Sequence, residues 1–215
     1  MLRTGLRTRR RTRWGVGVAS AKSDPNRPTK TDLAAARGRE IPDVLAPGLA
    51  VVFCGINPGL WSAATGHHFA RPGNRFWPTL HASGFTPRRF HPGEQEELLD
   101  YRLGITNLVG RGTARADELT AAELARGAEV LAAKTREMRP DWVAVLGVTA
   151  YRVAFGRRAA AVGRQPERLG PSGLWILPNP SGINAHETAA TLARSYGELR
   201  KIAYGDIVDS GGASV

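Results

Sequence analysis

The sequence is poor in the residues that hold small folds together through covalent bonds or metals. It has one cysteine, Cys54, which excludes an intramolecular disulfide, and no group of cysteine and histidine residues has the spacing of a zinc site. No run of about 18 apolar residues is present, so we expect no membrane span. With 215 residues, 42% of them hydrophobic, the chain can bury a core without such devices. These features fit one domain in a reducing, cytoplasmic compartment.

Acidic residues are missing from positions 1–23, which hold seven lysine and arginine residues. The formal charge of the whole chain is +11, so only +4 remains for everything that follows. A basic excess is typical of proteins that meet nucleic acid, but +4 also fits domains that never bind it. The Arg/Thr-rich start lacks the apolar stretch of a secretory signal. It is open to three interpretations: a transit peptide, a disordered basic arm, or an overextended gene start.

The chain divides into three parts by composition. We expect a basic, disordered tail over residues 1–40, one domain over residues 41–205, and a short disordered tail over residues 206–215. Little periodic apolar pattern precedes the first predicted strand, and a stretch rich in proline and glycine separates the two.

Short β-branched runs alternate with segments of helical apolar spacing in the predicted domain. Strands are predicted at 49–54, 104–109, 142–147 and 174–177, and helices at about 74–83, 94–102, 120–138, 148–155 and 187–203. The longest helix begins with a capping-box pattern formed by Thr120 and Glu123 and ends before Pro140. The alternation predicts a three-layer α/β/α sandwich with a mostly parallel central sheet.

Two loops that follow predicted strands have an unusual composition. One begins Gly55-Ile56-Asn57-Pro58-Gly59, and the other reads Asn179-Pro180-Ser181-Gly182. Neither is a P-loop or a dinucleotide fingerprint, and either could be turn chemistry alone. Because ligands of such folds bind beyond the carboxyl ends of the strands, we expect both loops at one edge of the sheet.

Four motifs taken together resemble the mismatch-specific uracil/thymine-DNA glycosylase family of the uracil-DNA glycosylase superfamily. They are Gly55-Ile56-Asn57-Pro58-Gly59, Gly66-His67-His68-Phe69, Pro72-Gly73-Asn74-Arg75-Phe76-Trp77 and Asn179-Pro180-Ser181-Gly182. The resemblance covers roughly residues 40–204, including Asp100 to Val109. It implies an enzyme that hydrolyses the N-glycosidic bond of uracil mispaired with guanine, with ethenocytosine and, more weakly, thymine as further substrates. It also implies a monomer that acts beside the chromosome on double-stranded DNA, without a cofactor or an obligate protein partner.

The resemblance implies roles for several residues of the two loops. Asn57 would be catalytic: an asparagine cannot take up a proton, so it would orient the attacking water. Backbone N–H groups near Ile56 and Phe69 would bind the pyrimidine, and Phe69 would stack on it, although a core aromatic is the alternative for Phe69. The substrate-binding residues implied are Gly55, Ile56, Pro58, Gly59, Ser62, Phe69, Asn179 and Ser181. For Ser62, a helix surface is the alternative.

The segment from Gly182 to His186 resembles the loop that enters the duplex when the target base is flipped out. Ile183 would fill the gap, and Asn184 would either pair with the widowed guanine or be an ordinary surface residue. Some relatives carry arginine near Ala185, so the resemblance does not fix the strength of the contact with the opposite guanine. The predicted DNA-binding residues are Gly182, Ile183, Asn184, Ala185 and His186.

Other candidates have simpler interpretations. The adjacent His67 and His68 lack the spacing of a metal pair, so no metal site is predicted, and Cys54 on a buried strand is expected to be an apolar filler. The role of Asn107 is left open, and the arginines between 152 and 168 would contact phosphates or only solvent. Three rival functions remain: a non-catalytic module that binds damaged DNA, an enzyme acting on free nucleosides, and a nucleic-acid binder that depends on its tail.

Overall fold

The computed structural model describes residues 27–182 and 187–205, which are organised around a five-stranded sheet. The strands are β1 (Val51–Gly55), β2 (Leu103–Asn107), β3 (Trp142–Leu146), β4 (Gly163–Leu169) and β5 (Ser172–Leu177). Their order is β2-β1-β3-β5-β4, and among these five only β4 runs antiparallel to its neighbour. The carboxyl ends of β1, β2, β3 and β5 therefore share one edge.

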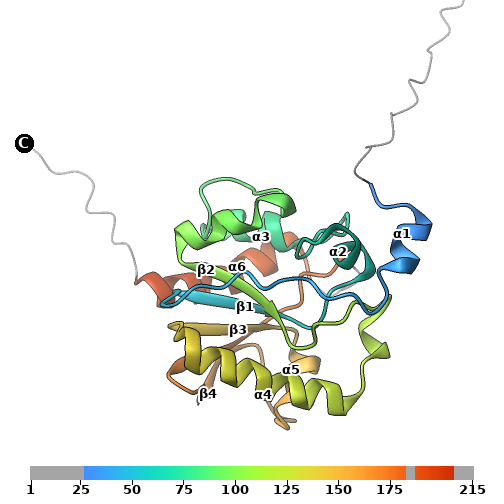
Figure 1. The fold of residues 1–215 in the computed structure, drawn as a ribbon. Helices are drawn as coiled ribbons and strands as arrows, with labels where there is room; N and C mark the ends of the chain where they lie inside the picture. The colour runs from blue at the N-terminus through green and yellow to red at the C-terminus, as the bar shows by residue number, and fades with distance from the viewer. Residues whose placement is uncertain (1–26, 183–186, 206–215) are drawn as a thin grey trace, which may run out of the picture.

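Helices cover both faces of this sheet (Figure 1). The helical elements are α1 (Lys30–Ala35), α2 (Leu60–Thr65), α3 (Phe76–Ala82), the 3₁₀ helices η1 (Pro92–Tyr101) and η2 (Ala116–Glu118), α4 (Ala121–Met138), α5 (Val148–Ala154) and α6 (Ala189–Tyr204). Residues of α3, η1 and α6 form the core on one face, and residues of α4 and α5 form the core on the other. Every residue of β1 and β5 is buried, as expected for strands covered on both sides. The predicted three-layer α/β/α architecture is confirmed.

The aromatic side chain of Phe53 anchors one helical layer to β1. Its ring lies edge-on to Phe76 of α3 and to Phe85, with centroids 5.5 and 5.3 Å apart, and it stacks 6.0 Å from Tyr196 of α6. Edge-to-face and stacked pairs at these distances add stabilisation beyond the buried area. The contacts fix α3 and α6 over the strand that leads to the first loop.

The structure differs from our prediction for residues 1–40, since residues 30–35 form α1. Thr29 and Asp32 cap this helix reciprocally, and backbone bonds tie the chain after it to Gly112, with Gly38 N 2.9 Å from Gly112 O and Gly112 N 2.8 Å from Arg39 O. One helical turn is too short to give a periodic apolar signal. The remainder of the predicted tails, residues 1–26 and 206–215, lies outside the described residues.

Three further elements were not predicted, the short 3₁₀ helix η2 and the two longer elements α2 and β4. α2 lies inside the segment that we interpreted as a loop, and its N-cap, Gly59, contributes no side-chain hydrogen bond. β4 is an edge strand with the sequence GRQPERL, whose arginine, glutamate and proline residues are depleted in strand interiors but common at sheet edges. Both elements are held by tertiary contacts that the local composition does not encode.

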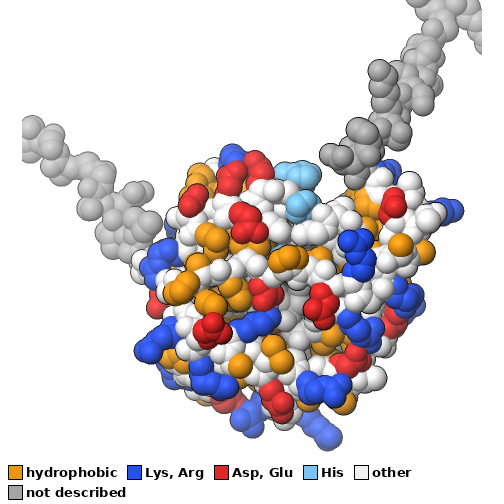
Figure 2. Space-filling model, in the orientation of Figure 1, with side chains coloured by type: hydrophobic (Ala, Val, Ile, Leu, Met, Phe, Trp, Pro, Cys, Tyr) orange, Lys and Arg blue, Asp and Glu red, His pale blue; other side chains and the backbone are white. Residues whose placement is uncertain are grey.

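The surface of the folded domain carries both charge signs. On the face in Figure 2, lysine and arginine side chains are interspersed with aspartate and glutamate. This agrees with the small charge excess that the sequence leaves after residue 23. Among the described residues, no helix combines the length and the apolar character needed to cross a membrane.

Gly127 allows α4 to approach the chain that leaves β2. A Cβ atom at this position would lie 2.2 Å from the backbone oxygen of Leu108, far inside van der Waals contact. Gly197 of α6 is the opposite case, because a Cβ atom there would meet nothing within 4 Å.

These two glycines make a matched test of the packing. We expect Gly127→Ala to lower the free energy of unfolding by about 1–3 kcal/mol, because overpacking outweighs the better helix propensity of alanine. Gly197→Ala should raise it by about 0.5–1 kcal/mol, because propensity acts alone. Urea denaturation of both variants measures the difference, and equal stabilities would contradict the close approach of α4.

Candidate active site at the carboxyl edge of the sheet

The loops that follow β1 and β5 meet at the end of β3. Gly147, with a φ of +125°, directly follows β3, and a Cβ atom built there would lie 3.6 Å from Ile56 Cδ1 and 3.7 Å from Asn179 Cβ and Nδ2. Side chains from the two loops thus flank the same glycine. Asn57 and Asn179, which are far apart in the sequence, follow strands that both pair with β3.

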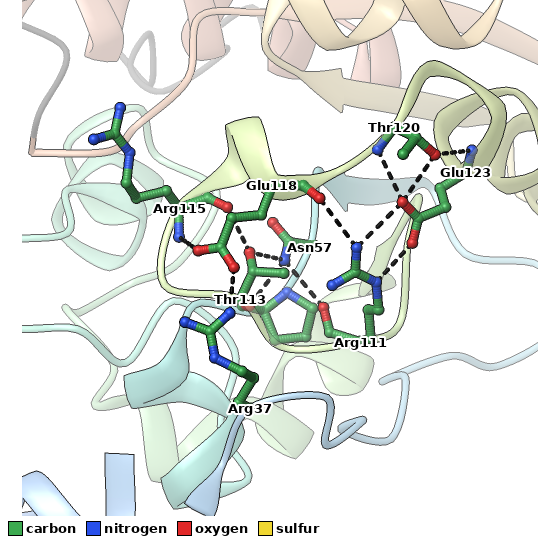
Figure 3. A network of polar contacts seen from close by, with 9 residues as sticks. Arg37, Asn57, Arg111, Thr113, Arg115, Glu118, Thr120 and Glu123 are labelled. Carbon is green, nitrogen blue, oxygen red and sulfur yellow. Dashed lines mark hydrogen bonds and ion pairs between the residues drawn. The ribbon is translucent and has the colours of Figure 1, made fainter. Parts of the chain in front are cut away.

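The side-chain amide of Asn57 is held in a fixed orientation (Figure 3). Its Nδ2 lies 2.8 Å from Thr113 Oγ1, 3.0 Å from Arg111 O and 3.1 Å from Pro58 O. Because the two carbonyls can only accept hydrogen bonds, the nitrogen has to be the group that faces them. Oδ1 has no hydrogen-bond partner among the described residues and is therefore the end of the amide that can accept one from a ligand.

Buried and charged contacts support the residues that hold Asn57. Thr113 is 1% exposed, and its hydroxyl donates to Arg115 O at 2.7 Å, which leaves the oxygen to accept from Asn57. Arg111 Nε lies 2.6 Å from Glu123 Oε1, and Arg37 pairs with Glu118 in the same network (Figure 3). Hydrogen bonds from the Arg111 guanidinium and from Thr120 lower the pKa of Glu123 to about 2, so Arg111 keeps an ionised partner at neutral pH.

Phe69 adopts a backbone conformation that is unusual for a bulky residue, with a φ of +54°. Its ring stacks on Phe76 at 4.0 Å between centroids, and its Cζ would lie 3.3 Å from a Cβ atom at Gly55. The amides on both sides are bound: His68 N lies 2.8 Å from Gln95 Oε1, and Ala70 N lies 3.1 Å from Ser62 Oγ. The fold thus holds the residue in a conformation that non-glycine residues rarely adopt.

Asn107, whose role the sequence left open, lies beside Gly55 and Phe69. A Cβ atom at Gly55 would be 2.4 Å from Asn107 Oδ1, so only glycine fits beneath this amide. The nitrogen Nδ2 faces His68 Nδ1 at 3.4 Å, and His68 Nε2 lies 2.9 Å from Pro42 O. Burial lowers the pKa of His68, so the ring is neutral at pH 7, donates to Pro42 and accepts from Asn107. Asn107 Oδ1 is thereby turned toward Gly55.

The other residues predicted to bind the substrate differ in their burial and their contacts. Ser62 is buried, and its hydroxyl oxygen accepts from Ala70 N. Pro58 is also buried, and its carbonyl oxygen accepts from Thr113 N at 3.1 Å. Gly59 begins α2, and Ser181 N donates to Asn179 Oδ1 at 2.9 Å. Gly182 packs against Gly73, whereas Ile183, Asn184, Ala185 and His186 lie outside the described residues.

A cavity of about 430 Å³ is lined by Asn107 and by residues of α4. Its lining includes Glu40, Asp43, Glu123 and Lys134. These charged residues share the lining with apolar ones such as Val109 and Val130. Within residues 27–182 and 187–205, no group of three histidine, cysteine, aspartate or glutamate residues could hold a metal ion.

The described residues thus form a mostly parallel α/β/α sandwich with asparagine-bearing loops at the carboxyl edge of its sheet. The model of the uracil DNA glycosylase superfamily matches residues 42–200, and the chain belongs to this superfamily. Its fold is similar to the solution NMR structure of a provisionally assigned uracil DNA glycosylase from Methanosarcina acetivorans, with a TM-score of 0.50 and 17% identity. The match covers 76% of this chain and 98% of the other. Membership in the superfamily supports a DNA glycosylase activity.

Thr113 tests whether the orientation of Asn57 matters for that activity. Thr113→Val keeps the shape of the side chain but removes the oxygen that accepts from Asn57, so we expect base excision to slow by roughly 10- to 100-fold. Thr113→Ser retains a hydroxyl and should remain close to the parent. Single-turnover excision rates measure both variants. Similar rates for valine and serine would show that this hydrogen bond does not position Asn57.

Proposed function

We propose that the protein is a monofunctional DNA glycosylase that hydrolyses uracil from guanine mispairs in double-stranded DNA and leaves an abasic site. The observation that carries this proposal is the orientation of Asn57. Three acceptors hold its amide nitrogen, and the amide oxygen is left for a water molecule at the carboxyl edge. A flipped nucleotide bound at this edge would bring its sugar to that water.

The chemistry needs a positioned water more than a strong base. Cleavage of a glycosidic bond passes through a transition state with oxocarbenium-ion character, which a weak nucleophile can trap. Asn57 Oδ1 accepts a hydrogen bond from the water and aims its lone pair at C1′, but an amide cannot remove the proton. We therefore expect slow chemistry compared with a site that has a carboxylate as general base.

The departing uracil carries negative charge, which the backbone beside Phe69 is suited to stabilise. The amides of His68 and Ala70 are already bound to Gln95 and Ser62. The N–H of Phe69 between them has no partner among the described residues. A fixed donor of this kind stabilises charge that develops in the transition state, as an oxyanion hole does.

Asn107 supports a preference for uracil over cytosine. Its Oδ1 is a hydrogen-bond acceptor, because His68 binds the nitrogen end of the amide. Uracil presents an N3–H donor, whereas cytosine presents a lone pair at N3 that would face the oxygen. A polar site that would leave a group unpaired discriminates strongly against the wrong ligand.

The described lysines favour attack by water over attack by an amine. Lys134 Nζ pairs with Asp43 and lies 3.1 Å from Thr106 Oγ1, whereas Lys30 and Lys201 are exposed on α1 and α6. A covalent route through a Schiff base needs a deprotonated amine beside the sugar. We therefore propose that the product is an abasic site in an uncut strand.

The decisive experiment measures excision from matched duplexes that contain G·U, G·ethenocytosine, G·T or G·C. We expect G·U to be cleaved fastest and G·C not at all, and Asn57→Ala to reduce the rate by roughly 100-fold because the water loses its anchor. Binding of a G·U duplex without excision would favour a non-catalytic damage-binding module. Release of uracil from free uridine at a comparable rate would favour a nucleoside hydrolase.

The substitution Asn57→Asp could in principle raise or lower the excision rate, so it is an informative test. A carboxylate is a better base, but here it would direct an oxygen at Arg111 O and Pro58 O, which only accept hydrogen bonds. We expect the excision rate at pH 7.5 to fall below that of the parent. A higher rate would show that the carboxylate reorganises this environment and acts as general base.

A further inference from the structure

Arg75, the N-cap residue of α3, binds the loop that follows β5 from more than 100 positions away in the sequence. Its backbone N lies 3.0 Å from Pro180 O, its Nε 3.4 Å from the same oxygen, and its Nη2 2.7 Å from Ser181 O. Nη1 also donates to the carbonyl of Glu187, which precedes α6. One residue thus supplies donors to three carbonyls of the chain between β5 and α6.

The two segments also contact each other through their backbones. A Cβ atom at Gly182 would lie 2.6 Å from the oxygen of Gly73, which leaves no room for a side chain between them. Gly73 itself has a φ of +84°, a conformation that glycine adopts without strain. Residues 73–75 and 180–182 therefore form one packed unit.

This unit determines where Asn179 lies. Asn179 Oδ1 accepts from Ser181 N at 2.9 Å, so the orientation of its side chain follows the backbone that Arg75 holds. The same side chain lies against Gly147 opposite Ile56, the residue before Asn57. The segment that Arg75 holds thus reaches the same glycine that the loop of the proposed water-binding residue flanks.

Arginine suits this task better than lysine does. Its planar guanidinium presents donors in a rigid fork, which can reach several carbonyls at once. A lysine ammonium carries its three donors on one atom, so it cannot spread them over carbonyls as far apart as those of Ser181 and Glu187 in the way that the guanidinium does. We propose that Arg75 is a positioning residue that fixes the 179–182 segment for base excision, an inference that rests on the proposed function.

Arg75→Ala and Arg75→Lys are the test variants, and Arg200→Ala is the matched control. Arg200 Nε donates to Gly84 O at 2.7 Å and so joins α6 to the chain after α3, the same two helices at their other ends. We expect the single-turnover excision rate to fall by roughly 10- to 100-fold in Arg75→Ala, less in Arg75→Lys, and little in Arg200→Ala.

Two further readouts separate positioning from other roles of an arginine. If Arg75 positions the loop, the salt dependence of duplex binding stays unchanged; if it contacts a phosphate, the slope of log K against log salt falls by about 1, which would overturn the proposal. Amide hydrogen exchange at Ser181 should accelerate in Arg75→Ala but not in Arg200→Ala.

The outcomes distinguish this inference from the proposed function. An active parent protein whose Arg75→Ala variant keeps both its excision rate and its slow exchange at Ser181 overturns the role of Arg75 alone. A parent that excises no base refutes the proposed function. In that case, unchanged exchange at Ser181 would also refute positioning of the loop by Arg75.

Discussion

The arrangement of the site depends on four parallel strands that direct their carboxyl ends to one edge. Strands buried on both faces need a helical layer on each side, and the connections through those layers return each strand in the same direction. With β3 between β1 and β5, the loops after β1 and β5 have to meet above the end of β3. Gly147 lies at that point, without a side chain to separate Ile56 from Asn179.

Within this frame, asparagine amides are oriented by the protein rather than by a ligand. The amide nitrogen of Asn57 donates hydrogen bonds to carbonyl oxygens and to a hydroxyl. The amide nitrogen of Asn107 faces His68, whose ring burial keeps neutral. Each of the two therefore presents a defined acceptor oxygen. Preorganised dipoles of this kind need no rearrangement when a substrate binds, which is one way in which a folded protein lowers a barrier.

The sequence predicted the elements whose signal is local. The β-branched runs at β1 and β3 and the capping box of α4 correspond to observed elements within a few residues, and the predicted sheet edge holds both motif loops. α1, α2, η2 and β4 were missed, because a helix of six residues or fewer or a charged edge strand carries no periodic apolar pattern. For these elements, tertiary contacts decide the conformation.

Site residues follow the same division. The motif that contains Asn57 can be recognised in the sequence, but Thr113, which accepts a hydrogen bond from Asn57, is 56 positions away. Arg75 donates to carbonyls that are 105 to 112 positions away. The hydroxyl of Ser62 likewise binds the backbone of Ala70, a contact that the sequence around Ser62 does not indicate. Long-range hydrogen bonds of this kind depend on the folded arrangement and leave no spacing that could be recognised beforehand.

Gly55 limits how this protein can evolve. Its missing side chain leaves the space that the Asn107 amide and the edge of the Phe69 ring occupy, so that even a methyl group would displace one of them. At Gly55 the site is therefore formed by backbone atoms alone, and a substitution there cannot add a side chain without a clash. A change in what this site accepts would therefore come from a neighbouring side chain, such as that of Asn107 at the end of β2, rather than from Gly55 itself.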